Sequence, residues 1–137
     1  LRASGLEIER IALDERSGEN EIRQAIVKAE QADVVIAALF GRVRTGSKNS
    51  VGLPASGEMA LRGILRSEVK TVSVAFGNPY LILGFPDMKN YLVAYGDMVS
   101  LQQAAANALM GRQDIGGKLP ITIGGYERGT GSVIKKQ

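Results

Sequence analysis

The sequence contains no cysteine and no histidine, and each absence excludes a class of chemistry. Without cysteine the chain forms no disulfide bridge and offers no thiolate metal ligand. Without histidine it cannot build a Ser–His–Asp triad, a histidine general base or one of the usual zinc sites. Chemistry of these kinds would have to come from outside this chain.

Tryptophan is absent as well, and the aromatic residues are three phenylalanines and four tyrosines. So few rings argue against a stacking platform for single-stranded nucleic acid. The net charge of +3 is not gathered into a basic stripe. No apolar run reaches the roughly 18 residues expected of a membrane-spanning helix. We therefore expect neither a nucleic acid nor a membrane among the partners.

The length of 137 residues fits one domain and is too short for a (β/α)₈ barrel of about 250 residues. Glycine is in excess: its 17 residues make up about 12% of the chain, against a usual share of about 7%. This excess is typical of a chain with many tight turns. The sequence begins at Leu1 without a methionine or a signal peptide, which suggests a fragment of a longer protein.

Hydrophobic periodicity divides the chain into alternating strands and helices. Residues 6–13 alternate between apolar and charged, the period of a half-exposed strand. The continuous apolar run VVIAALF at residues 34–40 is typical of a strand covered on both faces in a parallel sheet. Ser56 and Ser100 are placed to cap helices. We expect strands at residues 6–13, 34–40, 70–76, 91–95 and 119–123, helices at 19–32, 56–67 and 100–111, and a helical turn at 80–84.

This order predicts an α/β fold: a three-layer αβα sandwich, flavodoxin-like, with a mainly parallel sheet of about five strands. Residues 1–123 would form a single sandwich domain. Residues 124–137, which are rich in glycine and lysine, would form a C-terminal tail or linker.

Polar residues follow several of the predicted strands. Ligands of open parallel sheets collect beyond the carboxyl ends of the strands, so Arg42, Asn78 and Asp97 could converge on one edge. The alternative is that Asn78 and Asp97 only satisfy the backbone of their turns and that Arg42 is a solvated loop charge. The long loop at residues 41–55 lacks the G-x-x-x-x-G-K-S/T spacing of a phosphate loop.

Five short motifs, in this order and spacing, resemble one known family. They are ADVVI at residues 32–36, FGNPY at 76–80, YLVAY at 91–95, QAAA at 103–106 and GKLPITI at 117–123. Together they are similar to the C-terminal α/β domain of glycoside hydrolase family 3, in its bacterial β-N-acetylglucosaminidase and β-glucosidase-like members. The likeness covers about residues 6–131.

The resemblance implies an accessory domain of a larger enzyme. In that family the catalytic nucleophile is an aspartate on a separate (β/α)₈ barrel of the same polypeptide, and the active site opens at the junction of the two domains. The parent enzyme would hydrolyse β-N-acetylglucosaminides or β-glucosides without a cofactor or metal, and the isolated chain would be inactive. In some bacterial proteins of this type a serine-hydrolase domain follows. The resemblance slightly favours a periplasmic or secreted location.

The resemblance also suggests which residues would lie near the sugar. Arg42, Arg44 and Ser47 would be the loop groups nearest the substrate, Asn78 would brace that loop, and Asp97 would lie at the same edge. In β-glucosidase-type members a glutamate of the matching loop is the acid/base, but residues 41–55 contain no Asp or Glu. No catalytic residue is therefore carried over to this chain.

Two functions of other classes stay open. One is a stand-alone flavodoxin-like module that binds a nucleotide or small anion at the strand ends. The other is a purely structural unit between domains. An exposed apolar face would favour a docked or structural domain over a stand-alone module.

Overall fold

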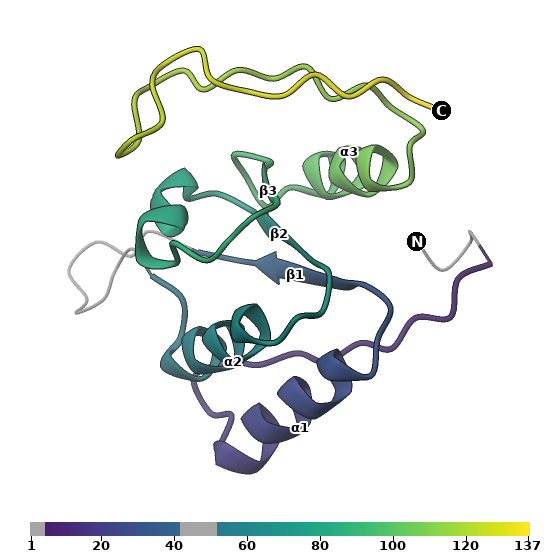
Figure 1. Ribbon diagram of the computed structural model, residues 1–137, viewed down its shortest axis with the longest axis vertical. Helices are drawn as coiled ribbons and strands as arrows, with labels where there is room; N and C mark the ends of the chain where they lie inside the picture. Colours follow the sequence, from purple (N-terminus) through teal and green to yellow (C-terminus); the bar gives the residue numbers. More distant parts are fainter. Residues whose placement is uncertain (1–4, 42–51) are drawn as a thin grey trace.

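The computed structural model describes residues 5–41 and 52–137. Within these residues the chain forms a small open parallel sheet with helices on both of its faces (Figure 1). This confirms the predicted α/β class. The elements, in chain order, are α1 (Glu19–Glu30), β1 (Val35–Leu39), α2 (Ala55–Arg66), β2 (Thr71–Ala75), the 3-10 helix η2 (Pro79–Gly84), β3 (Tyr91–Val93) and α3 (Val99–Leu109).

The sheet has three parallel strands in the order β1-β2-β3. Val35 pairs with Thr71 at one end of the first ladder, and Ser73 pairs with Tyr91 in the second. Because all three strands run the same way, their carboxyl ends meet at one edge of the sheet. β2 is central, and β1 and β3 form the two edges.

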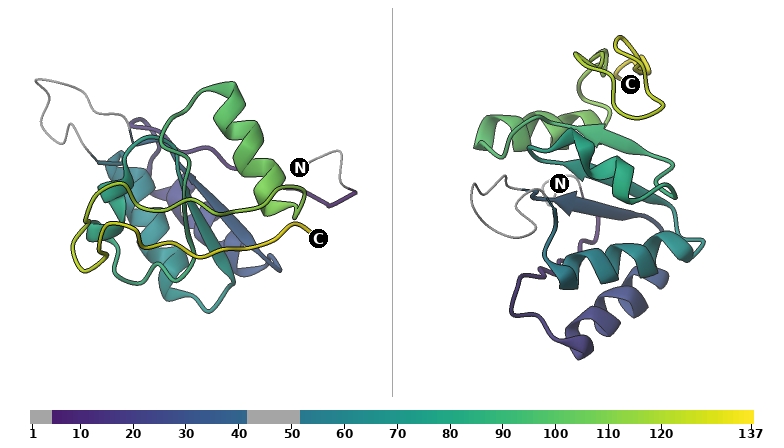
Figure 2. Two further views of the ribbon diagram at one scale, coloured as in Figure 1. Left: turned by 90° about the horizontal axis from the view of Figure 1, so that it is seen from above. Right: turned by 90° about the vertical axis from the view of Figure 1, so that its left-hand side faces the viewer.

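The order of the layers depends on which side chains each strand directs to each face of the sheet. α2 covers one face of the sheet, α1 packs on α2, and α3 covers the other face (Figure 2). On the α2 side, Leu39, Ala75 and Leu61 belong to a core that also takes in side chains from η2 and the loop after it. On the α3 side, Val74 and Phe76 pack against Ala105. Alternate residues of a strand point to opposite faces, so β2 supplies both cores.

The predicted helices are confirmed, with two corrections at their starts. α1 begins after Gly18, whose N–H donates to Glu21 Oε2 at 2.7 Å, and acidic residues fill its first turn, where the helix dipole favours them. Ser56 does not cap α2: it lies inside that helix and donates its hydroxyl to the carbonyl of Asp14. Ser100 does not cap α3 either, since the helix begins at Val99.

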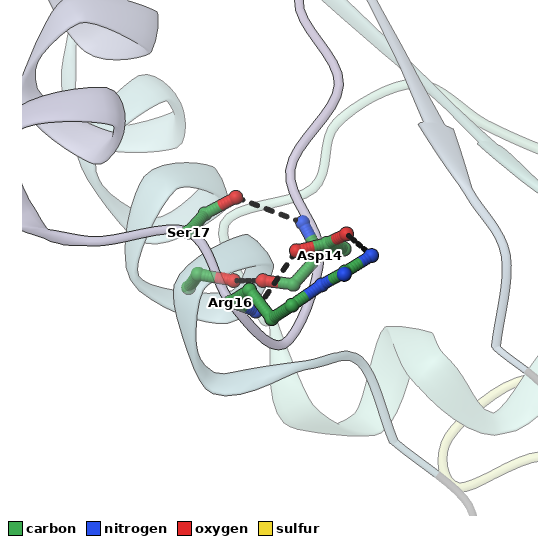
Figure 3. A network of polar contacts seen from close by, with 4 residues as sticks. Asp14, Arg16 and Ser17 are labelled. Atoms are coloured by element: carbon green, nitrogen blue, oxygen red, sulfur yellow. Dashed lines mark hydrogen bonds and ion pairs between the residues drawn. The ribbon is translucent and has the colours of Figure 1, made fainter.

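The prediction of a strand at residues 6–13 is wrong. This segment has no regular secondary structure and pairs with no strand among the described residues. An ion pair between Glu9 and Lys28 ties it to α1. A turn held by Asp14 and Ser17 follows (Figure 3), in which the Asp14 N–H donates to Ser17 Oγ at 3.0 Å. Period-2 alternation indicates an extended chain, but a strand also needs a neighbour to share its hydrogen bonds.

The strand predicted at residues 119–123 is wrong for a different reason. This stretch folds back on the residues that follow it, and together they form an irregular two-stranded ribbon on the α3 side of the molecule (Figure 1). Leu119 N–H donates to Thr130 O at 2.9 Å, and Ile123 and Tyr126 exchange two backbone hydrogen bonds at 2.9 Å. The predicted boundary between domain and tail falls at the tip of this ribbon, where Ile123 is buried.

Candidate functional site

Two glycines allow the loops after β1 and β2 to touch at the carboxyl edge of the sheet. Gly77 has φ +115, and a β-carbon there would lie 3.2 Å from the carbonyl oxygen of Gly41. A β-carbon on Gly41 would lie 3.1 Å from Leu81 Cδ1. A larger residue at either position would separate the loops, because both contacts are tighter than ordinary van der Waals distance.

Asn78 is buried beside these glycines and caps η2. Its Oδ1 accepts a hydrogen bond from the Tyr80 N–H at 2.9 Å. The interpretation that Asn78 satisfies turn backbone is therefore confirmed. The cap also fixes the direction in which the chain leaves β2, and hence the position of Tyr80.

Tyr91, on β3, holds the same turn from the other side. Its hydroxyl donates to the Pro79 carbonyl at 3.0 Å. Burial raises the pKa of Tyr91 to about 12; the Ile82 backbone partly lowers it, and the neighbouring Tyr95 hydroxyl raises it further. Tyr91 is thus a neutral brace over the ordinary pH range.

Asp97 lies half-buried in the turn that joins β3 to α3. Its carbonyl accepts a hydrogen bond from Gln102 Nε2 at 2.7 Å. The parallel sheet brings Asn78 and Asp97 to the same edge. The Asn78 side chain holds its own turn, and its carbonyl accepts a hydrogen bond from the Tyr91 hydroxyl of β3 at 3.5 Å. The other predicted site residues, Arg42, Arg44 and Ser47, lie outside the described residues.

Sequence reasoning missed an exposed apolar face on β1. Val34 is 52% exposed, Ile36 41% and Phe40 46%. All three point to the α3 side of the sheet, where α3 packs on β2 and β3. Phe40 stacks on Phe76 with ring centroids 4.9 Å apart, so the exposed face continues the core without a break. The run VVIAALF could have indicated this exposed face. β1 is an edge strand, and the run is more apolar than an edge strand normally is.

A cavity of about 610 Å³ lies at the opposite, amino-terminal edge of the sheet. Acidic and basic side chains both line it, among them Glu30, Asp33, Arg66 and Lys70. It is open and lies away from the glycines, Asn78 and Tyr91. We therefore place the candidate site at the carboxyl edge, where buried polar contacts fix the geometry.

The described part of the chain contains no group of three or more carboxylates that could hold a metal ion. Across residues 5–41 and 52–137, none of the helices has the length and apolar character needed to cross a membrane. No protein-family model, curated protein or solved structure matches this chain.

Proposed function

We propose that this chain is the accessory C-terminal α/β domain of an enzyme of the glycoside hydrolase family 3 type. It would form one wall of the sugar site beside a catalytic (β/α)₈ barrel on the same polypeptide. The parent enzyme would hydrolyse β-N-acetylglucosaminides or β-glucosides. The motifs FGNPY and GKLPITI support the family, and the exposed face of β1 supports the docked role.

The exposed face of β1 is the observation that carries this proposal. Val34, Ile36 and Phe40 together expose an area on the order of 200 Å². A stable interface between free proteins needs about 800 Å² on each partner. The β1 face is thus too small to hold a separate partner by itself, but it suits a domain tethered within one polypeptide, where the effective concentration is high.

The polar groups at the carboxyl edge suit binding better than bond cleavage. Glycoside hydrolysis uses two carboxyl groups placed around the scissile bond. The described part of this edge offers the Asn78 amide, tyrosine hydroxyls and one carboxylate, that of Asp97. A wall that orients the sugar while the barrel supplies the carboxylates agrees with this inventory.

The wider flavodoxin-like sheet of about five strands belongs to the same proposal. It would require further strands beside the three described, and the apolar edge of β1 is the position best suited to accept one. A strand added there would pair with β1 in the hydrogen-bonding direction and would leave Ile36 and Phe40 on the face that docks.

The first test is activity. The 137-residue chain should hydrolyse neither nitrophenyl β-N-acetylglucosaminide nor nitrophenyl β-glucoside. The natural polypeptide that carries the chain should hydrolyse at least one of them, and Ile36→Lys should lower its activity because a charge would be buried at the docking face. Val27→Lys, on the exposed face of α1, is the matched control. Turnover by the isolated chain that a substitution here abolishes would overturn the proposal.

A purely structural unit between domains is the second candidate, because the same exposed face would serve it. In that case Ile36→Lys would weaken domain docking in the natural polypeptide but leave its activity on the nitrophenyl sugars intact. The chain would instead be a stand-alone module that binds a nucleotide or anion if its melting temperature rose with nucleotides or phosphate and did not rise with sugars.

A further inference from the structure

Two tyrosine rings stand half-exposed at the carboxyl edge of the sheet. Tyr80, in η2 after β2, is 46% exposed, and Tyr95, just after β3, is 47% exposed. β2 and β3 are neighbours and run parallel, so both residues leave the sheet at the same edge. Each tyrosine is therefore about half accessible to solvent instead of filling the core.

Hydrogen bonds hold the backbone segments that carry the two tyrosines. The Tyr80 N–H is held by Asn78 Oδ1 at 2.9 Å. The Tyr91 hydroxyl donates to the carbonyl of Pro79, directly before Tyr80, at 3.0 Å. The Ala94 N–H, directly before Tyr95, donates to the Ala75 carbonyl at the end of β2 at 2.9 Å. β3 is thus bonded both to the turn that carries Tyr80 and to the end of β2.

The backbone at Tyr95 is strained. Its φ is +58, and among the described residues it alone combines a positive φ with a residue other than glycine. Glycine adopts this conformation freely, whereas a bulky residue does so only when its surroundings force it. Burial does not explain a tyrosine here, because half of the ring is exposed. Strain of this kind is found at binding sites, where a side chain is needed at a fixed place.

We propose that Tyr80 and Tyr95 form a binding platform for the pyranose rings of a β-linked saccharide. The apolar face of a sugar would stack on the phenol rings, and their hydroxyls would donate to or accept from the sugar hydroxyls. This inference rests on the proposed function and names residues for its sugar site. Phe40 ends the exposed face of β1 at the same edge, so a saccharide on this platform would lie where the docking face ends.

The test uses the 137-residue chain and two probes, cellobiose and N,N′-diacetylchitobiose. The chain has no tryptophan, so its ultraviolet emission comes from its four tyrosines and reports on them directly. We expect saturable changes in this emission and in the ring NMR signals of Tyr80 and Tyr95. Tyr95→Gly should weaken binding roughly tenfold, because it removes one stacking face. Its melting temperature should stay equal or rise, because glycine relieves the strain.

Two further variants separate stacking from folding. Tyr80→Phe keeps the ring and should retain most of the binding, whereas Tyr80→Ala should lose it. Val27→Ala, on α1, should bind as the unchanged chain does. Full binding by Tyr95→Gly, or no change at Tyr80 and Tyr95 with either saccharide, would overturn the platform. So would a response to AMP without a response to saccharides. None of these results tests the proposal that the exposed face of β1 docks on another domain. That proposal fails only if Ile36→Lys leaves the natural polypeptide unaffected.

Discussion

Replacing Gly63 with alanine should destabilise the protein, although alanine is the better helix former. Gly63 lies within α2 and faces α1, and a β-carbon there would be 2.9 Å from Ile26 Cγ1 and closer still to Ile26 Cδ1. Overpacking of this kind costs about 1–3 kcal/mol. Alanine recovers about 1 kcal/mol of helix propensity. The net change should be a loss of up to about 2 kcal/mol in the free energy of unfolding.

The sign of this change should reverse when the opposing side chain is shortened. In an Ile26→Ala background both of the close atoms are gone, so only the helix-propensity gain of about 1 kcal/mol remains. Gly63→Ala should then stabilise the protein. The two substitutions are therefore coupled by about 1–3 kcal/mol. Gly57→Ala is the control within the same helix, because its β-carbon would meet nothing nearer than Pro54 Cδ at 3.9 Å.

The assay is urea unfolding of the four chains of the cycle, followed by far-ultraviolet circular dichroism. An unchanged slope against urea identifies an effect on stability rather than on the unfolded ensemble. The packing of α1 on α2 would be refuted if Gly63→Ala were equally favourable in both backgrounds. The same conclusion would follow if Gly57→Ala were as harmful as Gly63→Ala.

Three other outcomes follow from single contacts. Asn78→Ala should cost about 1 kcal/mol of stability in urea unfolding because the Tyr80 N–H loses its cap, and Asn78→Asp should restore most of it. The folded protein should lose stability as the pH rises from 10 towards 12. In the folded state Tyr91, whose pKa is raised to about 12, keeps its proton, whereas the unfolded chain releases it. Tyr91→Phe should flatten this loss, and urea unfolding at several pH values checks it. The Lys136 N–H and the Lys135 ammonium lower the pKa of Asp114, so the Lys136 amide signal in NMR should shift only as the pH falls below 3.8. A shift already complete above that pH would contradict the described end of the ribbon.

The carboxyl edge shows how the backbone prepares a surface before any ligand is considered. Gly77 lets β2 turn sharply against the loop after β1, Asn78 then caps η2, and Tyr91 fixes that turn from β3. The turn that carries Tyr80 is therefore held by the buried Asn78 and the half-buried Tyr91. A platform supported in this way keeps its shape when empty, which lowers the ordering cost of binding.

The sequence by itself determined the elements whose cause is local. The apolar spacing of α1 and α2 was sufficient to predict two helices, and the continuous run at β1 was sufficient to predict a strand of a parallel sheet, although one face of that strand is exposed rather than covered. Asn78 was expected to satisfy its turn, since a short amide side chain beside a proline and a glycine has few other partners. These predictions depend on residues close together in the chain, and the structure confirms them.

Pairing was decided only by the tertiary structure. Residues 6–13 and 119–123 carry strand-like patterns. Among the described residues the first is joined to α1 by an ion pair and to no strand, and the second pairs with the chain that follows it. The exposure of Ile36 and Phe40, and the placement of Tyr80 and Tyr95 at one edge of the sheet, likewise depend on which strands become neighbours. The pattern of side chains in a segment shows that the segment favours an extended backbone. The partners with which the segment forms hydrogen bonds and packs are distant in sequence, so only the folded chain selects these partners.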